Sequence, residues 1–133
     1  MLRRFGQIAW IRGLRDERGA SAAEFVLVLP LLVMLTLGVI NAGLMLYTMA
    51  TLHFAVEDAA RCATVKVDCG GGDPDLVAAY AAAVYKGPTI TPTFTLSRPG
   101  CGNKVTGTAN YVFTTGLVSR TVPISAEACY PLK

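Results

Sequence analysis

The sequence lacks most of what an enzyme active site needs. Its 133 residues include one histidine, His53, with no Ser/His/Asp or Cys/His arrangement around it, and no carboxylate pair set up for acid–base chemistry. The one glycine run, in DCGGGDPD, lacks the GK[ST] ending of a phosphate-binding loop and does not follow a strand. We therefore expect no enzyme, no cofactor and no small-molecule substrate.

Charged residues are also scarce, and they are unevenly placed. They make up 16% of the chain. Residues 1–19 carry five arginines against Asp16 and Glu17, whereas residues 20–133 carry seven basic and seven acidic groups. The basic character therefore belongs to the N-terminus. Because a nucleic-acid partner needs a basic patch on the folded domain, no nucleic acid is expected to bind.

Residues 25–50 contain no charged side chain, and nearly all are aliphatic, aromatic or small. A helix of this length reaches roughly 39 Å, more than the ~30 Å hydrocarbon core of a bilayer. A buried helix this long would need a far larger protein around it. Basic residues beside a span stay in the cytoplasm. We therefore expect a single-pass protein of the inner (cytoplasmic) membrane, with its N-terminus in the cytoplasm and its C-terminal domain in the periplasm or outside the cell.

An ordinary secretory signal is an alternative interpretation of the same residues. The basic flank fits, and a small-residue cleavage site ends at Ala50. The apolar run is much longer than the roughly 7 to 15 residues usual in such signals, so the spanning helix is favoured.

The junction between the basic leader and the apolar run has the sequence RGASAAEF. It places one carboxylate, Glu24, at the edge of lipid. An unpaired charge near hydrocarbon costs several kcal/mol by order of magnitude, so such a group is usually paired or functional. The alternative is that Glu24 only marks the start of a helix, where the helix dipole favours an acid.

This junction resembles the processing signal of type IV prepilins, in which a membrane peptidase cuts after a glycine and leaves a glutamate as the fifth mature residue, followed by an aromatic. The matching residues are Gly19, Glu24 and Phe25. The longer stretch RGASAAEFVLVLPLLVMLTLGVINAGLMLY, with its early Pro30, is similar to the TadE-like family of minor pilins or pseudopilins in tight-adherence (Tad) pilus and secretion systems. The likeness continues through EDAARCATV to the final EACYP.

The resemblance implies a structural subunit, cut between Gly19 and Ala20, that uses Glu24 and Phe25 in assembly. It also implies partners: a prepilin peptidase, other pilin-like subunits and the pilus assembly platform, besides the membrane itself. The related major pilins are much shorter, which favours a minor role, with the pilus as a further location. The alternative function is a membrane-anchored binding module outside the cytoplasm that does not assemble into a filament.

The rest of the sequence predicts an α+β fold. After a leader of residues 1–19, the helix of residues 20–66 spans the membrane and continues as a polar-faced stalk. A small outer domain, residues 67–133, follows. In it the glycine run is a turn, and Asp73 and Pro74 begin a short helix over residues 74–86. Strands over residues 91–98, 103–115 and 119–129 then form a small antiparallel sheet.

Four cysteines lie on the predicted outer side of the membrane, where disulfides can form. They are Cys62, Cys69, Cys101 and Cys129, for which three pairings are possible. We favour Cys62 with Cys69 and Cys101 with Cys129, because the first pair flanks a turn and the second flanks two strands. The first pairing requires the helix to break between its cysteines. A zinc site is the alternative, but the sequence has no CxxC pair, and no metal is expected.

Overall fold

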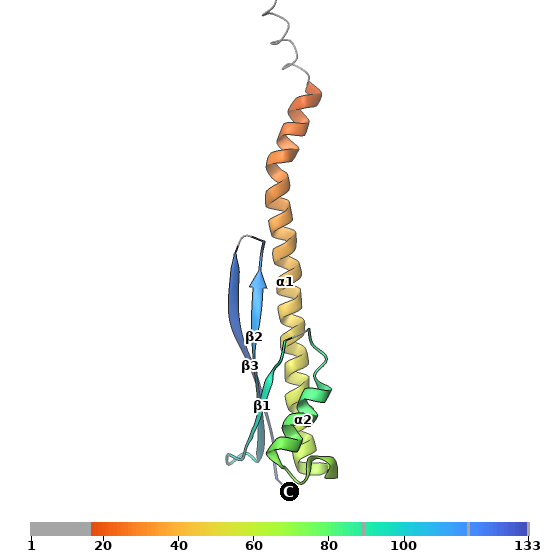
Figure 1. Ribbon diagram of the computed structural model, residues 1–133, viewed down its shortest axis with the longest axis vertical. Helices are drawn as coiled ribbons and strands as arrows, with labels where there is room; N and C mark the ends of the chain where they lie inside the picture. Colours follow the sequence, from red (N-terminus) through yellow and green to blue (C-terminus); the bar gives the residue numbers. More distant parts are fainter. Residues whose placement is uncertain (1–16, 89, 117, 133) are drawn as a thin grey trace, which may run out of the picture.

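A computed structural model describes residues 17–88, 90–116 and 118–132. It shows the predicted α+β architecture (Figure 1). Most of the predicted leader lies outside the described residues. The elements in chain order are the helix α1 (Glu17–Val65), the short 3-10 helix η2 (Val67–Cys69), the helix α2 (Pro74–Val84) and the strands β1 (Thr93–Ser97), β2 (Asn103–Thr114) and β3 (Ser119–Tyr130).

The helix α1 has 49 residues and two unlike halves. Its C-terminal half buries one face in the core, and its N-terminal half projects beyond the sheet (Figure 1). The opposite face of the C-terminal half carries the exposed Glu57 and Arg61. The buried face follows the three- and four-residue spacing of a helix surface, and four of its seven buried apolar members are alanines, which let other elements approach closely. These residues are Leu52, Ala55, Val56, Ala59, Ala60, Cys62 and Ala63.

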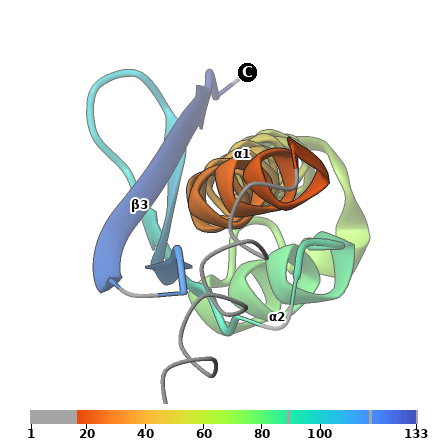
Figure 2. The ribbon, with the colours of Figure 1, turned by 90° about the horizontal axis from the view of Figure 1, so that it is seen from above.

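The sheet has the order β1-β2-β3, and both pairings are antiparallel. Figure 2 shows it on one side of α1, with α2 also packed against that helix. In β2 the buried residues alternate with more exposed ones, so that Val105, Ala109 and Tyr111 face the core. At Gly107 an added Cβ would come within 3.0 Å of side-chain atoms of Phe94, Leu52 and Val56. Only glycine allows the sheet to lie this close to α1.

The turn between α1 and α2 follows the sequence prediction. Gly70, Gly71 and Gly72 all have positive φ, a backbone conformation that side chains disfavour. Asp73 then caps α2, because its Oδ1 accepts hydrogen bonds from the backbone amides of Asp75 at 3.0 Å and Leu76 at 3.2 Å. The helix α2 ends at Val84, two residues before the predicted end.

Two disulfides close the part of the chain beyond the projecting helix. Cys62 bonds Cys69, with their Cα atoms 5.8 Å apart, and Cys101 bonds Cys129, with their Cα atoms 6.3 Å apart. These are the pairs favoured from the sequence. The first becomes possible because α1 ends at Val65 and the chain turns through η2. It is buried, whereas the second joins the loop before β2 to the end of β3 at the surface.

Removing the second disulfide should destabilise the fold more than removing the first. Closing loops of these lengths stabilises a protein by about 3.6 kcal/mol for Cys101–Cys129 and about 2.5 kcal/mol for Cys62–Cys69, in the chain-entropy model. We expect the double variant Cys101→Ser/Cys129→Ser to lose more free energy of unfolding than the double variant Cys62→Ala/Cys69→Ala. Urea unfolding of the detergent-solubilised protein measures this. Equal losses would show that burial of the first disulfide offsets its shorter loop.

A polar cluster ties the ends of α1, β1 and the glycine turn together. Asn103 is 1% exposed, and its Nδ2 donates to the carbonyl of Ala63 at 3.2 Å and to Thr64 Oγ1 at 3.1 Å. Arg98 donates from Nε to Asn103 Oδ1 and from Nη2 to the carbonyl of Gly72 at 2.8 Å. In this cluster the buried side chain of Asn103 thus has partners for both its donor and its acceptor.

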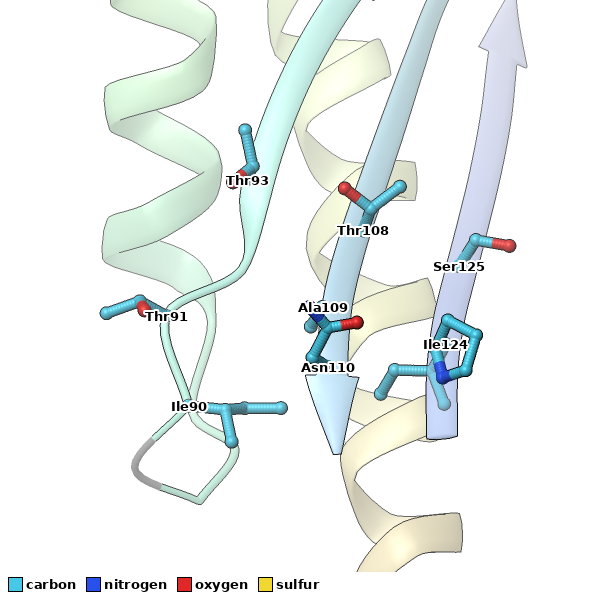
Figure 3. Close-up of a pocket in the computed structure, with 9 residues that line it drawn as sticks. Ile90, Thr91, Thr93, Thr108, Ala109, Asn110, Ile124 and Ser125 are labelled. Atoms are coloured by element: carbon cyan, nitrogen blue, oxygen red, sulfur yellow. The ribbon is translucent and has the colours of Figure 1, made fainter. Parts of the chain in front are cut away.

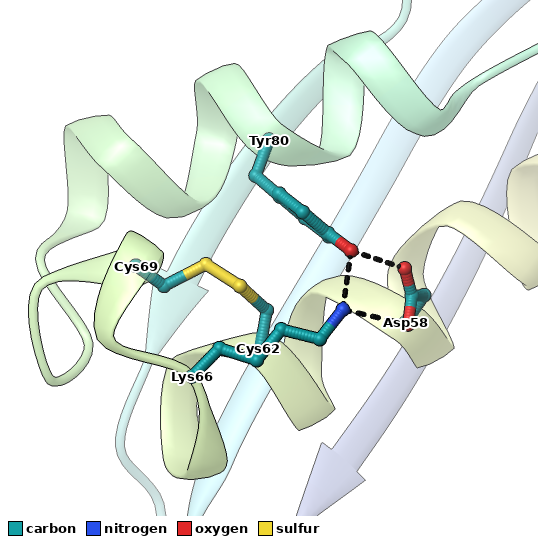
Figure 4. A network of polar contacts seen from close by, with 5 residues as sticks. All are labelled: Asp58, Cys62, Lys66, Cys69 and Tyr80. Carbon is teal, nitrogen blue, oxygen red and sulfur yellow. Dashed lines mark hydrogen bonds and ion pairs between the residues drawn. A yellow bond between two sulfur atoms is a disulfide. The ribbon is translucent and has the colours of Figure 1, made fainter.

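A second cluster joins α1 to α2 beside the buried disulfide (Figure 4). The Tyr80 hydroxyl donates to Asp58 Oδ2 at 2.6 Å, and Lys66 Nζ donates to the same hydroxyl at 2.6 Å. Lys66 Nζ lies 3.7 Å from Asp58 Oδ1. The hydrogen bond to Tyr80, assisted by the charge of Asp58, raises the pKa of Lys66, so its contribution to stability is complete at neutral pH and is lost only as the pH rises through this raised pKa.

Removing the Tyr80 hydroxyl should therefore weaken the fold, and Tyr85 provides a matched control. The Tyr85 hydroxyl lies near Thr51 in the core but makes no well-formed hydrogen bond with the described residues, and its burial raises the pKa of Tyr85. We expect Tyr80→Phe to cost about 1 kcal/mol, and Tyr85→Phe to cost nothing or to stabilise slightly. Urea unfolding at pH 7 checks both. If Tyr85→Phe lowers the free energy of unfolding as much as Tyr80→Phe does, the hydrogen bonds of the Tyr80 hydroxyl are not the cause of the loss.

Candidate membrane-spanning and assembly segment

The N-terminal half of α1 is a helix that is apolar on all sides and has no protein packed around most of it (Figure 1). Every large aliphatic or aromatic residue from 25 to 33 is exposed, and Leu27 is 80% exposed. A helix that is hydrophobic on every face needs cover on every face. These residues therefore need lipid or other helices around them. They are Phe25, Val26, Leu27, Val28, Leu29, Leu31, Leu32 and Val33.

Length and composition make this helix a candidate membrane span. The stretch Ala22–Val65 contains a window of mean hydropathy 2.5, none of which is buried in the protein. The helix continues through Pro30 without interruption. It is thus long and apolar enough to cross a bilayer, and it suggests a membrane anchor joined to a C-terminal domain.

Two polar side chains in the apolar run, those of Thr36 and Asn41, form hydrogen bonds within the helix. The Thr36 hydroxyl is within hydrogen-bonding distance of the carbonyls of Leu32, at 3.0 Å, and Val33, at 2.9 Å. The Asn41 amide donates to the carbonyl of Leu37 at 3.0 Å. Because lipid offers no hydrogen bonds, these internal contacts suit a helix that enters a membrane.

The residues predicted for processing and assembly lie at the start of α1. The helix begins at Glu17, so Gly19 and Ala20 lie in its first turn. Glu24 and Phe25 are exposed one turn further along. Within the described part of the chain Glu24 forms no ion pair. Residues 20 and 24 are four apart on a helix and so share a face.

A shallow groove lies where β1 separates from β2 (Figure 3). Its volume is about 580 Å³. Hydroxyl, amide and small apolar groups line it, without a charged side chain, so it can offer hydrogen bonds and apolar contact but no acid or base. The lining residues are Ile90, Thr91, Thr93, Thr108, Ala109, Asn110, Pro123, Ile124 and Ser125. In residues 17–132, apart from positions 89 and 117, no cluster of three histidine, cysteine or acidic side chains forms a metal site.

The fold defines the class of this chain: a small disulfide-bonded α+β protein carried on a long, freely projecting apolar helix. The family model described as TadE-like protein matches residues 19–61, which confirms the resemblance over the helix that carries it. The match covers about a third of the chain, so it shows that this segment is similar to TadE-like proteins. No curated protein and no solved structure matches the chain.

The sequence did not predict how the far end of the apolar run is covered. The Tyr111 hydroxyl donates to the carbonyl of Asn41 at 3.2 Å, although these residues are 70 positions apart. The loop between β2 and β3 lies beside Gly38 and Leu37. Nothing in the residues of either segment signals this contact.

Proposed function

We propose that the chain is a TadE-like minor pilin or pseudopilin, a structural subunit processed after Gly19 and assembled into a Tad-type pilus or secretion apparatus. The free apolar half of α1, with Glu24 and Phe25 at its start, is the observation that carries the proposal. Such a segment needs partners on all sides. The family match covers it.

The proposed arrangement has three parts. Residues 1–19 are the basic leader, residues 20–66 the span and stalk, and residues 67–133 the outer domain. The arginines hold the N-terminus on the cytoplasmic side of the inner membrane, and the outer domain lies in the periplasm or outside the cell. One disulfide within that domain and one joining it to the stalk suit an oxidising compartment.

Cleavage is the step that releases the subunit. Before it, the arginine-rich leader holds the helix at the cytoplasmic surface. After it, Ala20 carries a new ammonium group one helical turn from the Glu24 carboxylate. The two charges neutralise each other, within one helix or between neighbouring subunits, which lowers the cost of leaving the membrane for a packed bundle of helices. A prepilin peptidase, other pilin-like subunits and an assembly platform are the partners required.

The N-terminus of the protein from the native membrane tests this proposal. We expect Edman sequencing of the membrane fraction to find a chain that begins at Ala20. We also expect this chain to co-purify with pilus components. A chain that begins at Thr51 would support the secretory-signal alternative instead.

The groove beside β1 favours a second candidate, a membrane-anchored binding module that recognises a surface ligand. This function needs the anchor but neither cleavage nor helix packing. An uncut chain that stays in the membrane and does not co-purify with pilus components would support it over the pilin.

A further inference from the structure

The β2–β3 hairpin runs alongside α1 well beyond the core, with its turn towards the N-terminus of the helix (Figure 1). Tyr111 marks one level of this contact, through its hydrogen bond to the carbonyl of Asn41. The turn reaches further. A Cβ added at Gly116 would lie 3.8 Å from Leu37 Cδ1, and one added at Gly38 would lie 4.0 Å from Thr115 Cγ2. The turn thus lies beside residues inside the apolar run.

The length of the span sets the depth of this turn. From Ala22 to Asn41 a helix rises roughly 30 Å, which is the thickness of the hydrocarbon core. If α1 enters the hydrocarbon core near Ala22, it therefore leaves the core near Asn41, which is the level of Tyr111. Leu37 is four residues nearer the N-terminus, roughly 6 Å deeper. The hairpin turn lies on the membrane side of this boundary.

The hairpin has the composition that such a position requires. Residues 105–119 contain no charged side chain. Val112 is 54% exposed and Val118 is 56% exposed, so both offer apolar surface. The polar groups of the turn pair with each other, because Thr115 donates from its amide to the carbonyl of Val118 at 3.0 Å. The hydroxyls of Thr114 and Ser119 lie 3.5 Å apart.

Among the described residues, the acidic side chains after the span lie far from the turn. They belong to the C-terminal part of α1, to η2, to α2 and its cap, or to the end of β3 near Lys104. The charged residues near the boundary are basic. Lys86 accepts a hydrogen bond from the Tyr47 hydroxyl through its carbonyl, and Arg120 lies opposite Phe113 in the sheet. Tyrosines and cations within roughly 10 Å of such a boundary are typical of a membrane interface with phosphate headgroups.

We propose that the hairpin tip, residues 112–116 and 118, inserts into the outer leaflet of the bilayer at the boundary between headgroups and acyl chains. It is a second membrane contact beside the spanning helix, and its partner is a phospholipid surface. An inserted amphipathic element typically reaches 5–10 Å into this zone, about the depth derived above. The contact fixes the height and rotation of the outer domain on the membrane before assembly. It rests on the proposed function only in that α1 must span the bilayer.

Tryptophan fluorescence in vesicles tests the proposal with three variants of the full chain, in which the one native tryptophan is removed by Trp10→Phe. Val118→Trp reports on the tip. Leu31→Trp reports on the span, and Val67→Trp reports on the opposite end, where Val67 is 92% exposed. The vesicles contain phosphatidylcholine and phosphatidylglycerol, with or without brominated phosphatidylcholine. The bromines are near the carboxyl end of the acyl chains for Val118→Trp and Val67→Trp, and near the methyl end for Leu31→Trp, because residue 31 lies midway along the span.

We expect the brominated lipid to remove most of the Val118→Trp emission, which should be blue-shifted, and to leave Val67→Trp emission unchanged. If Leu31→Trp is quenched but Val118→Trp behaves like Val67→Trp, the tip lies in water and the inference is wrong while the span stands. If Val118→Trp is blue-shifted but not quenched, protein covers the tip, and a second copy of the chain replaces lipid as its partner. If Leu31→Trp is not quenched, α1 does not span, and the proposed function fails together with the inference.

Discussion

A Gly19→Phe variant should accumulate in the membrane as the uncut precursor. Gly19 has no side chain, so the backbone at the predicted scissile bond is open to a peptidase at the cytoplasmic face. The bond lies in the first turn of α1, where a phenylalanine would project from the helix beside it. We expect complete loss of the mature form, seen as a shift in gel mobility and confirmed by N-terminal sequencing.

Gly13→Phe is the matched control for this variant. It makes the same substitution in the leader, six residues away from the predicted bond. This variant should be cut like the wild type. If both variants are cut before Ala20, the peptidase does not require glycine at position 19. If neither is cut, the substitution disturbs insertion rather than recognition.

Local patterns predicted most of the elements because their causes are local. Asp73 and Pro74 begin α2 through a cap and a fixed φ, which depend on residues within one turn. Alternation along β2 gave its buried face, since Val105, Ala109 and Tyr111 lie two or four residues apart. The absence of charge over residues 25–50 likewise identified the apolar helix directly.

Contacts between distant segments could not be predicted in this way. Tyr80, Asp58 and Lys66 meet only because the turn at η2 folds α2 back against α1. In the sequence Asn103 is an ordinary polar residue at the start of a predicted strand. In the structure it is buried and donates hydrogen bonds to the end of α1. Such partners depend on the packing of whole elements, which no single segment encodes.

At the candidate site, too, the sequence did not predict a contact between distant segments, because it did not show that part of the apolar run is covered by protein. From the sequence, residues 25–50 are one continuous span. In the structure Thr48 is buried in the protein, Asn41 accepts a hydrogen bond from Tyr111, and only the N-terminal part of the run stands free. The exposed surface available to lipid or to neighbouring helices is therefore shorter than the run itself. Glu24 directly precedes that free part, so the proposed charge pairing can be tested there.

A Glu24→Gln variant should be inserted and cut after Gly19 but should enter pili poorly. Glutamine keeps the size of the side chain and removes its charge. The ammonium created at Ala20 is then left without its partner one helical turn away, and burying an unpaired ion among packed helices costs several kcal/mol by order of magnitude. We expect the amount that co-purifies with pilus components to fall at least about tenfold, which corresponds to about 1.4 kcal/mol.

Glu57→Gln provides the control for this loss. Glu57 is also exposed on α1, but it lies beyond the free apolar segment, and it forms no ion pair within the described residues. We expect this variant to be processed and to co-purify like the wild type, because its charge stays in water and has no ammonium to neutralise. Immunoblots of sheared pili and membrane fractions measure both variants, with N-terminal sequencing to verify cleavage. Glu24→Gln that is cut and recovered with pili at the wild-type level would show that Glu24 only starts the helix and that charge pairing does not drive assembly.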